Sequence, residues 1–264
     1  MPVAKKRFGQ HFLNDPGILR RIAAAVQVEG GETLLEIGPG PGGLTGELAR
    51  TGARLVAIEK DRDLVPLLRA RFPAARIIEG DALEVDWHEL VGPGPFRIAG
   101  NIPYNITTPL IEKALAPPRP LVAVYLVQRE LADRVAAPPG SGTYGALSVG
   151  VQVVARVERL FTVPAGAFKP RPKVDSAVLR MTPLAEPLIA DRERVPLRRF
   201  VVGLFGFRRK QLGRGLRELT GAPAAVVAGW LGEAEIDETA RPETLEPARF
   251  VRLFRAAQRH PPAE

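Results

Sequence analysis

The feature that most constrains the fold is an alternation of short apolar segments with longer amphipathic ones over the first 183 residues. Segments 33–37, 54–58, 76–78, 96–99 and 121–127 have the length and apolar content of buried strands. Segments 16–26, 44–50, 61–71 and 107–115 between them have helical spacing. This alternation predicts a parallel sheet with helices on both faces. Segments 150–157 and 176–181 are predicted to be the last two strands.

The chain changes character after Pro183. No segment beyond Pro187 has the pattern of a strand, and apolar residues recur at helical spacing in segments 191–205, 208–219, 222–231 and 247–257. We therefore predict two domains, an α/β domain over residues 1–184 and a small all-α domain over residues 185–264.

A glycine-rich loop follows the first predicted strand of the sheet. Gly38, Gly40 and Gly43 have the GxGxxG spacing with which a loop approaches a nucleotide cofactor, and Glu59 ends the next strand, where an acid accepts from ribose hydroxyls. NAD and S-adenosylmethionine sites share this layout, and a tight turn without a ligand has the same glycines. Glu36 before the loop and Asp81 after the third strand favour S-adenosylmethionine.

The segment Asn101-Ile-Pro-Tyr104 follows the fourth predicted strand. An exocyclic amine on a nucleobase is a poor nucleophile because its lone pair is delocalised into the ring. A site that alkylates such an amine needs acceptors for its hydrogens and an aromatic surface for the base. Asn101 offers an amide oxygen, Ile102 a backbone carbonyl beside the rigid Pro103, and Tyr104 a ring. We therefore predict a base-handling site here, although an ordinary loop is the simpler interpretation of four residues alone.

The charge of the chain favours a polyanionic partner. The 264 residues have a net charge of +8, and basic residues gather at Lys5, Lys6 and Arg7 and again around Arg208, Arg209 and Lys210. Either cluster could be a solvated surface, but their position on both sides of a base-handling site favours RNA contact.

Other classes of function are disfavoured by composition. The sequence has no Cys, and its three His residues are scattered, so we expect no metal site. The sequence lacks both a membrane-spanning apolar run and the apolar core of a signal peptide, so we expect a cytoplasmic protein that does not contact membranes.

Five motifs, taken in order, resemble the ribosomal RNA small subunit adenine N6,N6-dimethyltransferase family (KsgA/RsmA/Dim1 family), which also includes the Erm resistance enzymes. The motifs are Lys6-Arg-Phe-Gly-Gln-His-Phe-Leu13, Glu36-Ile-Gly-Pro-Gly40, Gly80-Asp-Ala82, Asn101-Ile-Pro-Tyr-Asn105 and Phe168-Lys-Pro-Arg-Pro-Lys-Val-Asp-Ser176. The resemblance implies a Rossmann-like class I methyltransferase domain with a helical RNA-binding or ribosome-binding domain. It implies S-adenosylmethionine as cofactor and two adjacent adenosines near the 3′ end of small-subunit (16S) rRNA as substrate.

The resemblance also assigns roles to particular residues. His11, Leu13, Gly38 and Gly40 would contact the cofactor, Glu59 its ribose and Asp81 its adenine amine, and Asn101 would touch both the cofactor and the base. Tyr104 would stack on a flipped adenine, and Phe168 would close the other face of the base or brace the pocket. Each aromatic ring could instead be packing. The family usually has Asn where this chain has His11, so the His11 contact is the least secure of the set.

Two alternatives to the small-subunit enzyme remain at this point. One is an Erm-type methyltransferase acting on large-subunit rRNA, and the other is a non-catalytic assembly or transcription factor on the same scaffold. Phe207-Arg-Arg-Lys-Gln-Leu212 and Asn105 resemble the small-subunit branch. The presence of both Asn101 and Tyr104 argues for an active enzyme, and nothing requires more than a monomer.

Overall fold

The computed structural model describes Lys5 and residues 9–260. The chain forms two compact units, one of Met1–Ala132 with Arg156–Pro183 and the other of Asp133–Ala155 with Leu184–Glu264. Residues 133–155, predicted to belong to the first domain, belong to the helical unit in the structure. The reason is packing between segments distant in the sequence. The Tyr144 hydroxyl donates to the carbonyl of Leu245, and helix α7 (Ala146–Gln152) packs on other helices of the second unit.

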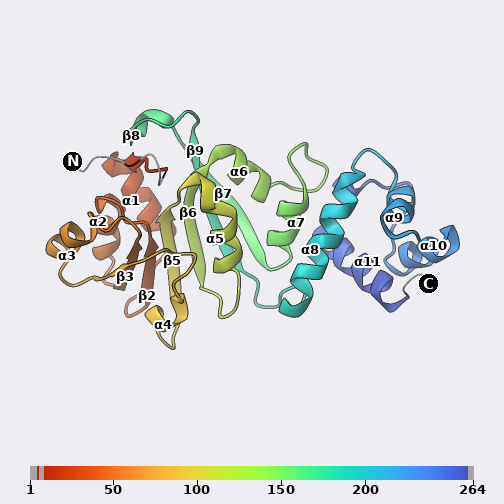
Figure 1. Ribbon diagram of the computed structural model, residues 1–264, viewed down its shortest axis with the longest axis horizontal. Helices are drawn as coiled ribbons and strands as arrows, with labels where there is room; N and C mark the ends of the chain where they lie inside the picture. Colours follow the sequence, from red (N-terminus) through yellow and green to blue (C-terminus); the bar gives the residue numbers. More distant parts are fainter. Residues whose placement is uncertain (1–4, 6–8, 261–264) are drawn as a thin grey trace. The chain divides into compact units, whose positions relative to one another are not determined.

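The first unit contains a seven-stranded sheet in the order β4-β3-β2-β5-β6-β9-β7 (Figure 1). Pairing is parallel from β4 through β6, whereas β9 pairs antiparallel with β6. The strands are β2 (Thr33–Ile37), β3 (Arg54–Glu59), β4 (Arg76–Glu79), β5 (Phe96–Asn101), β6 (Val122–Gln128), β7 (Ala155–Val163) and β9 (Ser176–Pro183). The strand order reverses between β2 and β5, and an open sheet binds ligands at the carboxyl ends of the strands at such a reversal.

Helices cover both faces of this sheet, as the alternating pattern predicted. The helices α1 (Pro16–Ala25), α2 (Gly43–Ala49) and α3 (Val65–Arg71) lie on one face, and α4 (Trp87–Val91) and α5 (Thr107–Ala114) lie on the other (Figure 1). Leu19 and Ile22 of α1 and Leu48 of α2 share a buried core with sheet residues such as Leu34 and Val124. Burial of this apolar surface is the main stabilising contribution to the unit.

Two short strands fasten the N-terminal segment to a later loop. Strand β1 (Phe12–Leu13) pairs antiparallel with β8 (Phe168–Lys169), with Phe12 opposite Lys169 and Leu13 opposite Phe168. The Asn14 N–H also donates to the carbonyl of Ala167 at 3.0 Å. The remaining short elements are the single-turn helices η2 (Tyr104–Ile106), η3 (Ala165–Ala167) and η4 (Pro242–Thr244), and the helix α6 (Arg129–Val135).

Most predicted elements are confirmed within a few residues, and one is wrong. Segment 150–157 is not a strand: α7 runs through Gln152, and β7 begins only at Ala155. The side-chain amide of Gln152 donates to the carbonyls of Val135 and Ala137, which ties this helix to the preceding segment. Helix α3 begins at Val65 rather than near Asp61, because the Asp61 carboxylate accepts from the N–H of Asp63 in a turn.

The second unit is built mainly from helices. Its main helices are α8 (Asp191–Gly206), α9 (Leu212–Thr220), α10 (Ala224–Glu233) and α11 (Pro247–Arg259). Trp230 and Phe250 are among its largest fully buried side chains. Within the described residues of the whole chain, no helix combines the length and apolar character needed to cross a bilayer.

Candidate functional site

The glycine-rich loop turns sharply at the end of β2, as its sequence predicted. Gly38 and Gly40 have φ angles of 67° and 58°, which residues with a side chain rarely adopt. A Cβ atom on Gly40 would lie 3.2 Å from the ring of Phe12. The loop therefore needs glycine at both positions, and its backbone lies directly against the pocket.

Glu59 ends β3 and holds the glycine loop in place. One carboxylate oxygen accepts from the N–H of Gly40 at 2.9 Å, and the other accepts from the N–H of Asp61 at 2.7 Å. Burial raises the pKa of Glu59, although the two backbone N–H groups oppose the shift. A carboxylate anchored in this way presents fixed acceptors to the pocket.

Glu36 lies within β2, one residue before its end, and its side chain is 1% exposed. Burial raises the pKa of its carboxyl to about 8, the neighbouring Thr45 hydroxyl opposes this shift, and the nearby Glu59 carboxylate adds to it. Its Oε2 atom has no hydrogen-bond partner among the residues that the structure describes. A buried acceptor without a partner is energetically costly, so it marks a place where a ligand with a donor or a positive charge would be stabilised.

Asp81, the predicted adenine contact, follows β4 at the same edge of the sheet. Its carboxylate pairs with the ammonium of Lys60 and accepts from the N–H of Leu83 at 2.9 Å. Burial alone would raise the pKa of Asp81, but the hydrogen bonds from Lys60 and the Leu83 N–H, together with the positive charges of Lys60 and Lys113, outweigh it and lower that pKa. Asp81 is therefore an ionised acceptor at neutral pH, with the exposed Lys60 beside it.

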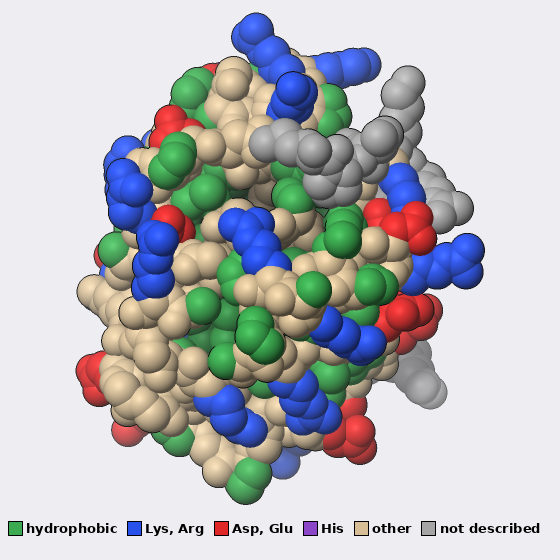
Figure 2. Space-filling view, turned by 90° about the vertical axis from the view of Figure 1, so that its left-hand side faces the viewer, with side chains coloured by type: hydrophobic (Ala, Val, Ile, Leu, Met, Phe, Trp, Pro, Cys, Tyr) green, Lys and Arg blue, Asp and Glu red, His purple; other side chains and the backbone are tan. Residues whose placement is uncertain are grey.

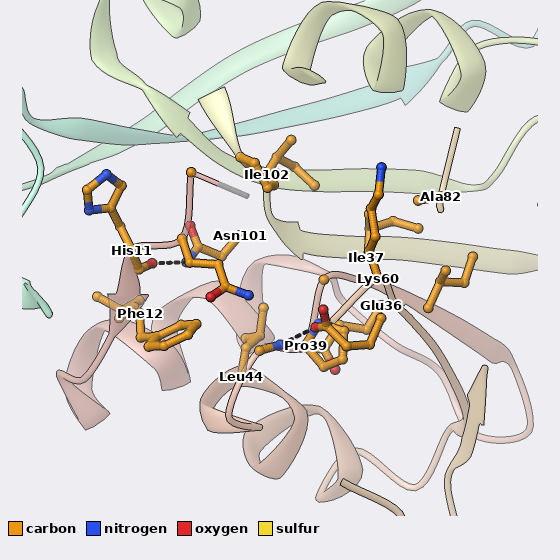
Figure 3. A pocket seen from close by; sticks show the side chains of 18 of the residues that line it. His11, Phe12, Glu36, Ile37, Pro39, Leu44, Lys60, Ala82, Asn101 and Ile102 are labelled. Carbon is orange, nitrogen blue, oxygen red and sulfur yellow. Dashed lines mark hydrogen bonds between the residues drawn. The ribbon is translucent and has the colours of Figure 1, made fainter. Parts of the chain in front are cut away.

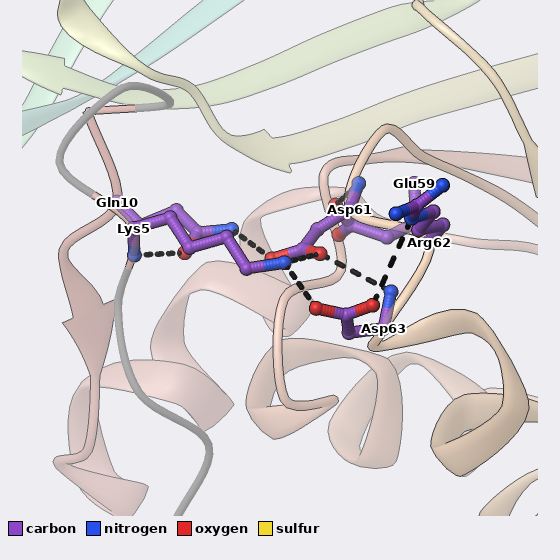
Figure 4. Close-up of polar contacts among 6 residues, drawn as sticks. All are labelled: Lys5, Gln10, Glu59, Asp61, Arg62 and Asp63. Atoms are coloured by element: carbon purple, nitrogen blue, oxygen red, sulfur yellow. Dashed lines mark hydrogen bonds and ion pairs between the residues drawn. The ribbon is translucent and has the colours of Figure 1, made fainter.

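The N-terminal segment crosses this edge and is fixed to the loop after β3 (Figure 4). Lys5 forms ion pairs with Asp61 and Asp63, and Gln10 donates to Asp61 at 3.2 Å. Asp61 is 2% exposed. Lys5, predicted as an RNA contact, therefore has two carboxylate partners, while the other two members of its predicted cluster, Lys6 and Arg7, lie outside the described residues.

Asn101 and Tyr104 lie at the end of β5, next to the N-terminal segment. The Asn101 amide donates to the backbone carbonyl of His11 at 2.8 Å (Figure 3). The ring of Tyr104 stacks on the imidazole of His11. The Tyr104 hydroxyl forms a hydrogen bond of 2.9 Å with the hydroxyl of Ser176. Both predicted base contacts are thus held by residues distant in sequence.

One pocket brings nearly all the predicted site residues together (Figure 3). Of those residues, the pocket is lined by His11, Leu13, Gly38, Gly40, Glu59, Asp81, Asn101, Ile102, Pro103 and Tyr104. The same pocket is lined by Glu36, which the sequence analysis weighed in choosing the cofactor but did not assign to the site. The sequence feature that could have placed Glu36 in the site is its position as an acid directly before the glycine-rich loop.

Phe168 is placed differently from the other predicted site residues. Its side chain is 5% exposed and packs in the hydrophobic core with Leu13 and Leu19. Phe168 does not line the pocket. The ring of Phe168 therefore packs in the core beneath β1 and does not present a face to the pocket.

The second predicted basic cluster, on the helical unit, is largely neutralised within the unit. Arg208 pairs with Glu243 at 2.8 Å and donates to the carbonyl of Gly142 at 3.1 Å. Lys210 pairs with Glu218. Arg209 is exposed, and no ion pair or hydrogen bond of its side chain is found within the described part of the chain.

The antiparallel strand β9, inserted between β6 and β7, departs from the all-parallel sheet of dinucleotide-binding oxidoreductases. This sheet, with Glu36, Glu59 and Asp81 at the carboxyl ends of adjacent strands, defines an S-adenosylmethionine-dependent methyltransferase of class I. The family described as Ribosomal RNA adenine dimethylase matches residues 1–259. The chain belongs to this family and is an rRNA adenine dimethyltransferase with S-adenosylmethionine as its cofactor.

Similar proteins cover nearly the whole chain. Ribosomal RNA small subunit methyltransferase A of Pseudomonas aeruginosa is 46% identical over 255 residues, which cover 95% of this chain and 93% of that protein. The protein of the same name from Acidithiobacillus ferrooxidans is 44% identical over 260 residues, 97% of this chain and 95% of that protein. These matches confirm the family predicted from the five motifs.

Solved structures agree with the fold. The 23S rRNA methyltransferase ErmE is 29% identical with a TM-score of 0.74, and the match covers 94% of this chain and 99% of that one. A dimethyladenosine transferase from Plasmodium falciparum is 24% identical with a TM-score of 0.79, covering 95% and 98%. The second likeness concerns the fold alone.

Proposed function

We propose that this enzyme dimethylates N6 of two adjacent adenosines near the 3′ end of small-subunit (16S) rRNA, acting on the small ribosomal subunit. The observation that carries the proposal is the convergence of Asn101 and Tyr104 on the pocket that also contains Glu36 and Glu59. Groups suited to a nucleobase and groups suited to a charged cofactor thus share one cavity. The names of the similar bacterial proteins favour the small-subunit substrate.

The pocket fits S-adenosylmethionine by the chemistry of its acceptors. Glu36 Oε2 would meet a positively charged group of the cofactor, because it is buried and lacks a partner among the described residues. Glu59 would accept from ribose hydroxyls, and Asp81 from the adenine amine. His11 and Leu13 would cover the ligand from the N-terminal segment, with Gly38 and Gly40 beneath it. When bound, the cofactor supplies a methyl group attached to a positively charged sulfur.

The residues at the end of β5 would activate and orient the target amine. The amide oxygen of Asn101 and the backbone carbonyl of Ile102 would accept hydrogens from N6, so that the nitrogen lone pair is drawn out of conjugation. Pro103 limits the freedom of this stretch, and the Tyr104 ring would hold the flipped base by stacking. No general base is needed, since N6 becomes acidic only after the methyl group arrives, and positioning dominates the rate.

The first experiment uses labelled S-adenosylmethionine and small subunits that lack this modification. We expect N6,N6-dimethyladenosine in fragments from the 3′ end of the small-subunit rRNA, identified by mass spectrometry. Asn101→Ala serves as the matched control: methyl transfer should fall below detection while RNA affinity stays within about twofold. Label in naked large-subunit rRNA alone would instead indicate an Erm-type enzyme, as the ErmE likeness allows. No label in either RNA would favour a non-catalytic assembly factor.

The same proposal includes a monomeric, cytoplasmic enzyme. The place of action follows from the substrate, since assembling small subunits occur in the cytoplasm of bacteria. Light scattering of the purified protein at increasing concentration would check the oligomeric state.

A further inference from the structure

A segment of alternating cations and prolines begins at the last residue of β8 and continues into the loop after it. Lys169, Pro170, Arg171, Pro172 and Lys173 form this segment, hereafter the basic loop (residues 169–173). The side chains of Lys169, Arg171 and Lys173 are exposed, whereas Pro172 is buried. Two prolines in five residues restrict the backbone, so the backbone of this segment loses little conformational freedom when a ligand binds.

Both ends of the basic loop are attached to the site. At its start, Lys169 pairs with Phe12 across the β1–β8 ladder, and the carbonyl of Pro170 accepts from the imidazole of His11 at 2.8 Å. Just beyond its end, Ser176 holds the hydroxyl of Tyr104. The basic loop is therefore fastened to the two residues, His11 and Tyr104, that line the target side of the pocket.

No acid among the described residues neutralises the three cations of the basic loop. Among the described residues, no ion pair or hydrogen bond of the Lys169, Arg171 or Lys173 side chains is found. The nearest acid in sequence, Asp175, is engaged elsewhere: it pairs with Arg129 at 3.4 Å and accepts from the N–H of Ala165 at 3.0 Å.

This arrangement contrasts with the clusters that the sequence favoured. Lys5, Arg208 and Lys210 each have a carboxylate partner. A cation that already has such a partner must give up that attraction to bind a phosphate, whereas the cations of the basic loop need not. Figure 2 shows Lys and Arg side chains projecting at the top of the view, the side on which β8 lies in Figure 1.

We propose that the basic loop binds the RNA backbone phosphates that flank the target adenosine, and so positions the strand whose base enters the pocket. The proposal rests on the proposed function, since it assumes an RNA substrate in this site. Phosphate contacts position a nucleic acid without reading its sequence, which suits a loop beside the pocket for the flipped base. Arg171 can donate two parallel hydrogen bonds to one phosphate, and the two lysines act as point charges.

The test is the salt dependence of RNA binding by the variant Lys169→Ala/Arg171→Ala/Lys173→Ala. Each phosphate contact to a single strand contributes about 0.7 to the slope of log affinity against log salt concentration. We expect the triple variant to lose about 2 from this slope, to bind RNA at least about tenfold more weakly at 0.15 M salt, and to keep its S-adenosylmethionine affinity. The charge-conserving variant Lys169→Arg/Lys173→Arg should keep the wild-type slope.

A matched control removes three other cations of the same unit. Arg50→Ala/Arg156→Ala/Arg159→Ala makes the same change in net charge at exposed residues that do not line the pocket. Equal slopes for this control and the triple variant would overturn the proposal, because the effect would then be one of net charge. Wild-type affinity in the triple variant, with active wild-type enzyme, would overturn it too. Failure of the wild-type enzyme to methylate small subunits would instead contradict the proposed function.

Discussion

The imidazole of His11 stacks on the ring of Tyr104, with the ring centroids 5.8 Å apart and the planes inclined by 25°. The same imidazole bonds the carbonyl of Pro170 through Nδ1, and because a carbonyl only accepts, Nδ1 carries the hydrogen. His11 therefore connects the base-handling residue to the basic loop.

We expect His11→Ala to raise the KM for RNA about tenfold while the Kd for S-adenosylmethionine changes less than about threefold, because His11 would cover the cofactor with its backbone, which the substitution keeps. The stack and the hydrogen bond together contribute on the order of 1–2 kcal/mol to the position of Tyr104 and the loop. Asn101 would stay in place, since its partner is the backbone carbonyl of His11, which any substitution retains. Steady-state kinetics and calorimetry measure the two constants. As controls, His11→Phe keeps a ring that can stack on Tyr104, and His11→Asn keeps a donor for the carbonyl of Pro170. Wild-type kinetics in His11→Ala would contradict the role assigned to the imidazole.

The hydroxyl of Tyr104 has a structural role that is separable from the role of its ring. It hydrogen-bonds Ser176, whose side chain is fully buried. Tyr104→Phe should lower the free energy of unfolding by about 1 kcal/mol, because Ser176 loses its partner, and should lower kcat/KM only a few-fold. Tyr104→Ala should lower kcat/KM by at least about a hundredfold. Denaturant unfolding of Tyr104→Phe, Ser176→Ala and the double variant checks the pair. Additive losses would show that the hydroxyls do not interact in solution.

The sheet and most of the pocket could be predicted from the sequence for a physical reason. Strand ends of a parallel sheet meet at one edge, so placing Gly38, Glu59, Asp81 and Asn101 after successive strands also placed them together. The prediction failed for segment 150–157, where two features of the sequence favour different structures. Segment 150–157 mixes valines, which favour strands, with the Gln152 amide, and the contacts of that amide to Val135 and Ala137 depend on tertiary structure.

The charged surface was harder to predict than the pocket, because the sequence shows cations but not their partners. Arg208 has Glu243 beside it, 35 residues away in the chain, and Lys5 has Asp61. The exposed cations of the basic loop received no role in the sequence analysis, since the motif that contains them was interpreted through Phe168. Pairing of charges is a property of the fold, and single-sequence reasoning has no access to it.

The neighbouring residues Arg208 and Arg209 should respond differently to the same substitution. Arg208→Ala removes a pair with Glu243 and bonds to the carbonyls of Ser141 and Gly142, so it should lower the free energy of unfolding by about 1–2 kcal/mol. Arg209→Ala should leave stability unchanged. As expected for the loss of one phosphate contact, it should reduce the slope of log affinity for the subunit against log salt concentration by about 0.7. Thermal unfolding and binding at several salt concentrations separate these effects. An unchanged slope for Arg209→Ala would remove this residue from the RNA interface.

The raised pKa of Glu36 makes both folding and cofactor binding depend on pH. With a pKa of about 8 in the folded protein against 4.5 for the ordinary side chain, the carboxyl binds more protons folded than unfolded between these values. The stability of the wild-type protein should therefore fall as pH rises from about 5 to 8, where the buried group must ionise. Glu36→Gln removes this contribution, so the melting temperature of the variant relative to wild type should be higher at pH 8 than at pH 5.

Cofactor binding should respond in the opposite direction. A positively charged group beside Glu36 Oε2 favours the ionised carboxylate, so binding should release close to one proton per cofactor at pH 7, and affinity should increase from pH 6 to pH 8. Calorimetry in two buffers of different ionisation enthalpy counts the released protons. Glu59 also has a raised pKa and interacts with Glu36, so the difference between wild type and Glu36→Gln reports the protons linked to Glu36, including any change that its charge causes in Glu59. Equal proton release from the two proteins would mean that the cofactor's positive charge lies elsewhere in the pocket.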